Sequence, residues 1–420
     1  MLNPADPDAP TEGAGTSRLP AFLAAFEVRN FRLIWTGAFL SSIGTWIQDV
    51  ALSWVIHTEF KNPAYLGWRQ FASELPLVAF MLLGGVLADR FNKKTILMAS
   101  QVVQLTLALV LAGLYYTGHL SIWAVVVVGF ITGLAQSQSA PTYQAFLTSI
   151  VPRDVIPRAV AMNSLQFNLS RSIGPPIAAA LLVGLGAAWC FAINAFSFLA
   201  IMVSLMMIRI PLAAANPRPP QGVAHSLKEG LAYVRRSPDI SMIVGLAGAL
   251  SFFVFPLTTF LPVVADEVLG SGAGGYSMLL SGIGLGAIVG AIGTAHRGRF
   301  EKRGKFVLIC FIAGPLLAAA AVLCGNQWMA TVLLFGYGVV QVSGSSTLNG
   351  LVQELAPEEM RGRIVALFGF TFRGGSPLGA LLLGYSVIWF GPAVAISASL
   401  IGMSLLCAAI LYHSPRFREL

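Results

Sequence analysis

Long apolar runs alternate with short polar breaks along almost the whole chain. A run of about 20 apolar residues is long enough to cross the hydrocarbon core of a membrane as an α-helix. Twelve such runs can be placed, in two sets of six with a polar stretch between the sets. The first set is predicted at residues 32–57, 64–88, 95–117, 121–150, 158–184 and 187–208, and the second at 239–265, 275–296, 305–324, 328–354, 363–388 and 391–412.

This pattern predicts an all-α polytopic membrane protein with twelve transmembrane helices in two six-helix halves. The stretch between the two sets is rich in Pro and holds a short amphipathic segment, which is typical of a linker. The first residues lack a basic region followed by an apolar core, so we expect a disordered cytoplasmic tail and not a cleaved signal. The expected parts are the tail 1–20, the first bundle 21–208, the linker 209–238, the second bundle 239–412 and the tail 413–420.

The two halves also resemble each other in sequence. When one half is shifted over the other by 205 positions, polar and turn residues coincide, most clearly in the fourth and tenth runs. Small residues can match by chance, but polar residues at the same depth are harder to match in this way. We therefore predict that the halves are structural repeats. The matched pairs include Gly133 with Gly338, Gln136 with Gln341, Gln144 with Asn349, Pro152 with Pro357 and Arg158 with Arg363.

Composition and charge agree with a membrane location. Hydrophobic residues make up 56% of the chain and charged residues 10%, far from the usual make-up of soluble proteins. Lys and Arg gather in every second loop and at the adjoining ends of the apolar runs, which would lie on one side of the membrane. Lys61 lies in a loop on the other side. Because short cytoplasmic loops carry the basic excess, both termini are predicted to be cytoplasmic. This topology accounts for the net charge of +8 without a nucleic-acid partner.

The loop between the second and third runs carries a charged signature, GVLADRFNKK, at residues 85–94. It resembles the cytoplasmic loop signature of the major facilitator superfamily, G-x-L-A-D-R-x-G-R-R/K. Asn92 stands where the family prefers glycine, and asparagine also tolerates a left-handed turn. The alternative is that any short cytoplasmic loop tends to be basic.

The resemblance extends over about residues 30–412. Within the superfamily, the first run, the charged loop and the segment VPRDVIPRAVAMNSL look most like the branch that contains the enterobactin exporter and macrolide-efflux proteins. This implies a multi-pass secondary transporter of the bacterial inner membrane, which exports a small amphipathic molecule, a siderophore or drug-like compound, by proton-coupled alternating access. An importer or lipid flippase on the same fold, and a transport-inactive sensor or scaffold, remain alternatives.

The partners expected from this interpretation are the substrate, protons and the lipid bilayer, and we expect the protein to be a monomer. The sequence contains no G-x4-G-K-[ST] motif for binding ATP. The four cysteines lie inside apolar runs without the spacing of a metal site or a disulfide framework. We therefore expect neither an enzymatic activity nor a cofactor or metal.

Ionisable residues inside a bilayer are costly, so each one is a functional candidate. Asp49 shares a helical face with Thr45 and Gln48 and lies roughly 12 Å from the outer end of the first run, and Arg69 lies roughly 9 Å inside the second. Because these depths nearly coincide, we predict an Asp49–Arg69 ion pair, which could be purely structural. Glu74 lies deeper and has no cation near it in sequence, so it is the better candidate to carry a proton, although it could also stay ionised in a water-filled cavity.

Two arginines, Arg171 and Arg373, lie deep in the fifth and eleventh runs, and each is followed four residues later by a proline. Facing a central cavity, these cations would attract an anionic substrate or pair with the carboxylates of the first hairpin. The alternative is that they bind backbone carbonyls freed by the prolines.

Helices one, four, seven and ten line the cavity in the superfamily, so the resemblance implies a pocket built from those runs. The fourth and tenth runs are polar and the seventh is aromatic, so one wall is expected to be polar and the other aromatic, although any single Phe could instead face lipid or the core. The expected cavity residues are Thr45, Gln48, Gln136, Tyr143, Gln144, Arg171, Phe252, Phe253, Phe255, Gln341, Asn349 and Arg373.

Small residues at helical spacing predict close helix packing. The fifth run holds a weak form of the antiporter motif G-x3-G-P-x2-G-G, centred on Gly174 and Pro175, and the eighth run carries a stripe of Gly282, Gly286 and Gly290. The resemblance implies that helices five and eight pair across the interface between the halves.

The charged loop also predicts a latch at the inner face. In the family, helices two and eleven meet across the halves, and a helix amino terminus favours a nearby carboxylate. We expect Asp89 to meet the start of the eleventh helix when the cavity opens outward; simple solvation of the loop is the alternative. The residues assigned to this latch are Gly85, Asp89, Arg90, Lys93, Lys94, Arg361 and Arg363.

Overall fold

The structure is a computed structural model that describes residues 21–90, 92–208, 223–298 and 300–420. The predicted tail 1–20 and residues 209–222 of the predicted linker lie outside the described residues. Within the described ranges every long element is an α-helix and no strand occurs. The predicted all-α class is therefore confirmed.

The first half of the chain forms six long helices after a short 3₁₀ helix. These elements are η1 (Ala21–Glu27), α1 (Arg29–Phe60), α2 (Ala64–Arg90), α3 (Lys93–Tyr116), α4 (Ile122–Ser149), α5 (Ile156–Gly184) and α6 (Ala187–Met207). Their bounds lie within a few residues of the predicted runs.

The second half begins after the amphipathic helix α7 (Val223–Arg236). Its elements are α8 (Pro238–Phe253), α9 (Leu257–Val263), the π-helix η2 (Val264–Val268), α10 (Gly272–Arg297), α11 (Arg303–Leu323), α12 (Gln327–Leu355), α13 (Arg361–Phe390), α14 (Pro392–His413) and α15 (Pro415–Glu419). The run predicted as one helix over 239–265 is interrupted after Phe253, because Pro256 lacks the N–H that would continue the helical hydrogen bonds.

Ten described stretches are long and apolar enough to cross a membrane, with Pro238–Val268 counted as one. Helices α2 and α5 have 27 and 29 residues but are not among those ten. With them, the described residues hold twelve long helical segments at the predicted places. The architecture is the predicted membrane-protein fold of two six-helix halves.

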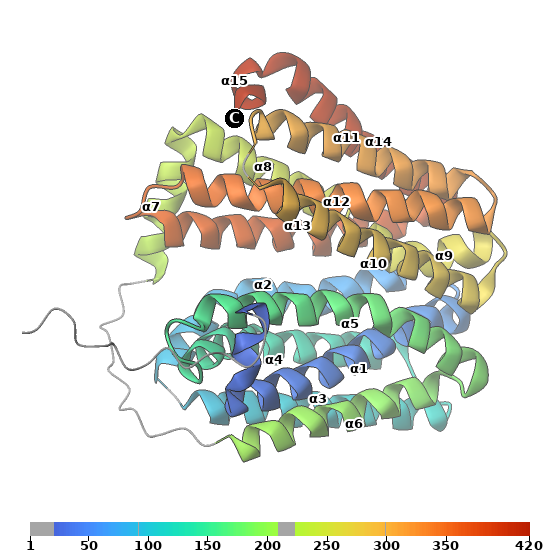
Figure 1. The fold of residues 1–420 in the computed structure, drawn as a ribbon. Helices are drawn as coiled ribbons and strands as arrows, with labels where there is room; N and C mark the ends of the chain where they lie inside the picture. Colours follow the sequence, from blue (N-terminus) through green and yellow to red (C-terminus); the bar gives the residue numbers. More distant parts are fainter. Residues whose placement is uncertain (1–20, 91, 209–222, 299) are drawn as a thin grey trace, which may run out of the picture.

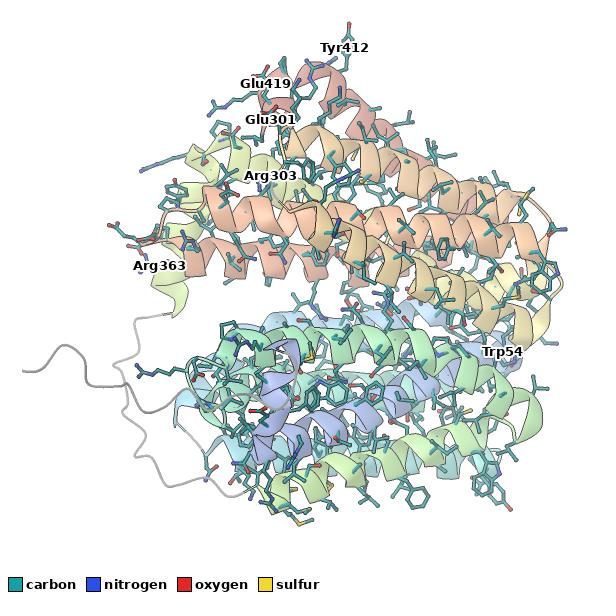
Figure 2. All side chains as sticks on the ribbon, in the orientation of Figure 1. Trp54, Glu301, Arg303, Arg363, Tyr412 and Glu419 are labelled. Atoms are coloured by element: carbon teal, nitrogen blue, oxygen red, sulfur yellow. The ribbon has the colours of Figure 1, made fainter. Side chains whose placement is uncertain are left out.

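Figure 1 shows α1–α6 in one bundle and α8–α15 in the other, with α7 at one end of the second bundle. We call this the linker end and the opposite one the distal end. Across the halves, α2 contacts α13 and α5 contacts α10. The ribbons converge at the distal end, where Trp54 lies between the halves (Figure 2). Trp54 stacks there on Tyr276 of α10, with ring centroids 6.3 Å apart.

Helix α5 uses small residues on two sides. A Cβ added at Gly174 would lie 2.4 Å from the Cβ of Trp46, so α5 packs tightly on α1 beside the buried Pro175. Toward the other half, a Cβ added at Gly284 of α10 would lie 3.1 Å from Ser172 Oγ. Helices α5 and α10, the fifth and eighth membrane segments, therefore meet across the halves.

The glycine stripe of α10 faces α12 of the same half, and not the other half. A Cβ added at Gly286 would lie 2.0 Å from Phe335 O, and one added at Gly290 would lie 2.3 Å from Val339 O. Gly282 meets the next turn of α12 in the same way. Close approach of these two backbones therefore requires glycine at the stripe.

We expect Gly286→Val to lower the melting temperature of the purified protein in detergent, because overpacking a filled interface costs about 1–3 kcal/mol. Gly293→Ala on the same helix is the control, since an added Cβ there meets no atom within 4 Å. Equal melting temperatures for the two variants would contradict the packing role of the stripe.

Candidate functional site

A polar cavity of about 180 Å³ lies inside the first half, between α1, α2, α3, α4 and α6. Arg373 of α13 is the residue of the second half that lines it. Four ionisable side chains line this cavity. Its polar lining consists of Thr45, Gln48, Asp49, Arg69, Gln70, Ser73, Glu74, Gln104, Thr132, Gln136, Asn194 and Arg373.

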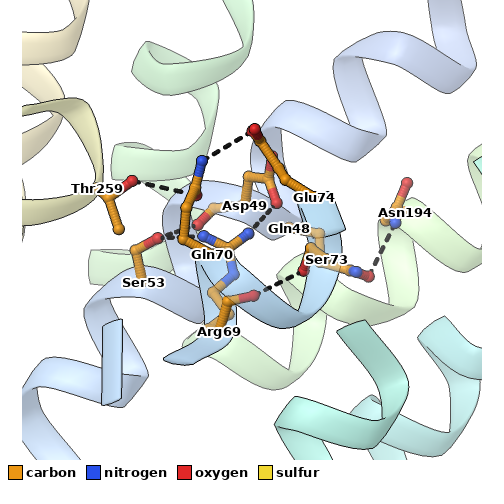
Figure 3. Close-up of polar contacts among 9 residues, drawn as sticks. All are labelled: Gln48, Asp49, Ser53, Arg69, Gln70, Ser73, Glu74, Asn194 and Thr259. Carbon is orange, nitrogen blue, oxygen red and sulfur yellow. Dashed lines mark hydrogen bonds and ion pairs between the residues drawn. The ribbon is translucent and has the colours of Figure 1, made fainter. Parts of the chain in front are cut away.

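The ion pair predicted from depth is present between α1 and α2 (Figure 3). Arg69 Nη2 donates to Asp49 Oδ1, and Arg69 Nη1 donates to Ser53 Oγ at 3.0 Å. Ser53 Oγ in turn donates to the backbone carbonyl of Asp49 at 2.8 Å. The Arg69 side chain is only 12% exposed, whereas Asp49 is 46% exposed. The arginine is thus enclosed by its partners, and the carboxylate keeps one side open to the cavity.

Glu74 lies one helical turn from Gln70, which is the centre of a second set of hydrogen bonds. Gln70 Nε2 donates to Glu74 Oε1 at 2.8 Å, and Gln70 Oε1 accepts from Thr259 Oγ1 of α9 at 3.1 Å (Figure 3). The same amide nitrogen lies 3.3 Å from Ser376 Oγ of α13. Through Gln70, the Glu74 carboxylate is therefore connected to two helices of the other half.

Glu74 has no obvious local cation in the sequence, but the structure brings one near it from the other half. Arg373 lines the same cavity and interacts electrostatically with Glu74, as does Arg69. Arg373 is almost 300 positions away in sequence, and only the packing of α13 against α2 brings it near. The local sequence around Glu74 could not reveal this partner.

The structure places Thr45, Gln48 and Gln136 along the cavity. Gln48 Oε1 accepts from Asn194 Nδ2 at 2.8 Å, which connects α1 with α6 (Figure 3). The sequence interpretation missed Asn194 and Gln70. The sequence feature that could have indicated these two cavity residues is that each is a polar residue inside a long apolar run.

Several predicted cavity residues lie elsewhere in this conformation. Tyr143 packs against the hydrophobic core at the linker end of the first half. Gln341 is buried within the second half, where its amide donates to Ser345 Oγ at 3.3 Å. Gln144 is exposed on α4, and the exposed Asn349 accepts a hydrogen bond on α12. Their helices belong to the expected set, but α12 does not line this cavity, and neither Tyr143 nor Gln144 of α4 is among its lining residues.

Arg171 does not line the cavity either. Its guanidinium carbon lies 5.8 Å from the ring centroid of Trp46 on α1, a cation–π contact. The residue lies close to Tyr337 of the other half, with which it interacts electrostatically. It therefore lies near the α5–α10 contact between the halves.

The expected aromatic wall packs inside the second half. Phe252 and Phe253 contact each other with ring centroids 4.9 Å apart, and Phe255 contacts Phe372 of α13 at 5.0 Å. Ser399 of α14 donates to the backbone carbonyl of Phe253. None of the three predicted residues lines the cavity; they contact α13 and α14 of their own half.

The latch residues are partly described. The side chains of Gly85, Asp89 and Arg90 lie outside the described residues. Lys94 Nζ donates to the carbonyl of Ile208 at 3.0 Å, and Lys93 Nζ lies 3.5 Å from that of Ala145.

On the other half, Arg361 Nε donates to the carbonyl of Gln353 at 3.1 Å, and Arg363 pairs with Glu229 of α7. Asn92 has φ of −63° and caps α3 through its side chain, so the left-handed turn considered for it does not occur.

A polar contact at the distal end was not anticipated from the sequence. His57 of α1 pairs with Asp266 of η2, with Nε2 and Oδ2 3.0 Å apart, and its Nδ1 lies 3.9 Å from Glu267 Oε1. Trp68 Nε1 donates to Tyr385 OH across α2 and α13 at 3.2 Å. These contacts join the two bundles at the distal end.

Comparisons with known proteins cover nearly the whole chain. A family model described as "Transmembrane secretion effector" matches residues 21–420. The "Staphyloferrin A transporter" of Staphylococcus aureus (strain NCTC 8325 / PS 47) is 23% identical over 389 residues, covering 91% of this chain and 95% of that protein. The "Enterobactin exporter EntS" of Escherichia coli O157:H7 is 26% identical over 399 residues, covering 93% of each chain.

The fold also has solved counterparts. A bacterial homolog to the human lysosomal transporter Spinster, in an inward-facing and unoccupied conformation, is similar with a TM-score of 0.73 and 14% identity, covering 93% of this chain and 98% of that chain. At this identity the likeness establishes a shared fold.

We expect Asp49→Asn to lower the free energy of unfolding by about 1–3 kcal/mol, because Arg69 then lies in the cavity without its counter-charge. The double variant Asp49→Asn/Arg69→Gln should lose less free energy of unfolding than the two single variants lose in sum, since the two side chains interact directly. Chemical unfolding in mixed micelles measures this, with the exposed Asp154→Asn as control. Additive effects would contradict a stabilising pair.

Proposed function

Because the chain belongs to the transmembrane secretion effector family of the major facilitator superfamily and is a membrane transporter of that kind, we propose that it exports a siderophore-like amphipathic molecule in exchange for protons. The observation that carries the proposal is the connection from the cavity carboxylates to the opposite half through Gln70. It offers a physical route by which a proton on Glu74 can influence how the halves meet.

The distribution of contacts supports a state that is closed at the distal end. His57 with Asp266, Trp68 with Tyr385, and the stack of Trp54 on Tyr276 hold the halves together there. We place the linker end in the cytoplasm, because loops on that side carry the basic residues. The structure would then face the cytoplasm, the side from which an exporter collects its substrate.

The cavity is suited to a polar or anionic substrate group. Arg373 reaches it from the second half and is exposed, while Gln48, Gln136 and Asn194 offer amide donors and acceptors. Its volume of about 180 Å³ is below the roughly 300–1,000 Å³ of pockets that hold drug-sized ligands. The cavity would therefore have to widen between the halves when the substrate binds, while the polar group of the substrate occupies this part.

Protons supply enough energy for this exchange. One proton that crosses about 100 mV provides roughly 2.3 kcal/mol. At about 1.4 kcal/mol per tenfold in concentration, this sustains roughly a fiftyfold gradient of a neutral substrate. Glu74 is the proposed carrier, because a neutral Glu74 would no longer hold the Gln70 amide as an ionised carboxylate does.

A growth screen of a deletion strain against siderophores and antibiotics would first identify a siderophore substrate. Everted membrane vesicles with an acidic interior should then accumulate that substrate. Glu74→Gln should abolish this gradient-driven accumulation and retain exchange between equal substrate pools, because exchange requires binding and conformational change but no net proton transfer. Glu301→Gln, the same substitution at an exposed carboxylate outside the cavity lining, is a matched control for expression. Loss of substrate from wild-type vesicles would indicate an importer, and normal accumulation by Glu74→Gln would exclude Glu74 as the carrier.

We also propose that Asp89, at the end of α2, latches onto the start of α13 when the cavity opens at the distal end. Such a contact between a carboxylate and a helix amino terminus is worth about 0.3–2 kcal/mol. In that state, Arg361 or Arg363 would add positive charge to the contact.

Cysteines introduced at Asp89 and Gly362 should crosslink in a preparation held open at the distal end, and should not do so when the linker end is open. Gly350→Cys paired with Asp89→Cys serves as a geometric control on the preceding helix. Equal crosslinking of the first pair in both states, or in neither, would remove the latch.

A further inference from the structure

A second cavity, of about 330 Å³, lies at the linker end of the second half. Helices α10 and α11 line it from two sides, and α12, against which both pack, lines it between them. It shares no lining residue with the polar cavity of the first half. We call this space the α10–α11 crevice.

The walls of the crevice are apolar. Val289, Val339 and Val340 contribute aliphatic surface. The hydroxyl of Thr294 donates to the carbonyl of Gly290 at 2.8 Å, and that of Ser343 donates to the carbonyl of Val339 at 2.8 Å, so both hydroxyls are already engaged by the helices. The interior therefore suits a hydrocarbon chain better than a polar molecule.

The crevice opens beside exposed apolar side chains of α10. Val289 is 49% exposed and Ile292 is 65% exposed, and both belong to a stretch long and apolar enough to cross a membrane. In a bilayer, acyl chains cover such exposed apolar side chains. A lipid tail therefore has direct access to the crevice from the side.

A single cation lies where this apolar space reaches the end of the membrane-spanning stretch. Arg297 is the last residue of α10, and its guanidinium carbon lies 5.6 Å from the ring centroid of Phe300 and 5.2 Å from that of Phe306. The two rings hold the cation through their faces, which leaves the N–H donors of the exposed guanidinium available. Among the described residues, no carboxylate forms an ion pair with Arg297.

We propose that the α10–α11 crevice binds an anionic phospholipid from the leaflet at the linker end. One acyl chain lies in the apolar crevice, and the phosphate accepts hydrogen bonds from Arg297. Guanidinium and phosphate form paired, charge-assisted hydrogen bonds, and basic pockets between membrane helices are suited to anionic head groups. Charge complementarity selects the head group and the apolar walls select a lipid over a free anion. This site is independent of the proposed transport cycle.

The test compares lipid binding by the full-length purified protein and its variants, with native mass spectrometry in a detergent that releases bulk lipid. Phosphatidylglycerol should bind more tightly than phosphatidylcholine. Arg297→Gln should weaken phosphatidylglycerol binding by about tenfold to a hundredfold, the range expected for a hydrogen bond to a charged group, and leave phosphatidylcholine unchanged. Arg153→Gln, an exposed arginine at the linker end of the first half, is the matched control.

A second variant tests the crevice without touching the charge. Gly293 lines the crevice, and a Cβ added there meets no atom within 4 Å, so Gly293→Leu should fold and fill the space for the acyl chain. It should weaken phosphatidylglycerol binding, whereas Gly113→Leu, at an equally open glycine of α3, should not.

Three outcomes would overturn the proposal. They are equal binding of the two lipids, equal losses in Arg297→Gln and Arg153→Gln, and unchanged phosphatidylglycerol binding by Gly293→Leu. Thermal stabilisation by inorganic phosphate alone that matches the stabilisation by phosphatidylglycerol would also overturn it, because the crevice would then have no part in binding. If Arg297→Gln does not fold, the Gly293→Leu comparison decides.

Discussion

The guanidinium of Arg69 must be compensated, because it is almost fully enclosed inside a membrane-spanning helix pair. Asp49 supplies the opposite charge and Ser53 a further acceptor, so α1 and α2 are held at one depth relative to each other. This compensation is incomplete in one respect that matters for function. Asp49 stays half exposed to a polar cavity, and Glu74 and Arg373 add one more charge of each sign to the same space.

Because Arg373 comes from the second half, the charge balance of the cavity depends on how the two bundles are placed. Gln70 extends this dependence, since one amide contacts Glu74 and also Thr259 and Ser376 of the other half. A change in the charge of Glu74, or separation of the halves, alters the same set of hydrogen bonds. Proton binding and conformational change can be coupled in this way without a long chain of intermediates.

The helices and the first hairpin could be predicted from sequence, because run length and residue depth are properties of one segment. The Asp49–Arg69 pair followed from two nearly equal depths. Helix rotation and contacts distant in sequence could not be predicted. Tyr143 and Phe253 lie on expected helices but face packed cores, and Arg373 reaches Glu74 only through the packing of α13 on α2.

Alternating access about the polar cavity is tested most directly by the distances between the two halves at the distal end and at the linker end. Spin labels at Lys61 and Gly274 report the distal end, and labels at Arg153 and Glu358 report the linker end. Pulsed electron resonance in nanodiscs, with and without substrate and at acidic and neutral pH, should show reciprocal changes: as one pair moves apart, the other approaches. Distances that stay fixed at both ends, or that lengthen together, would contradict a rocking transporter.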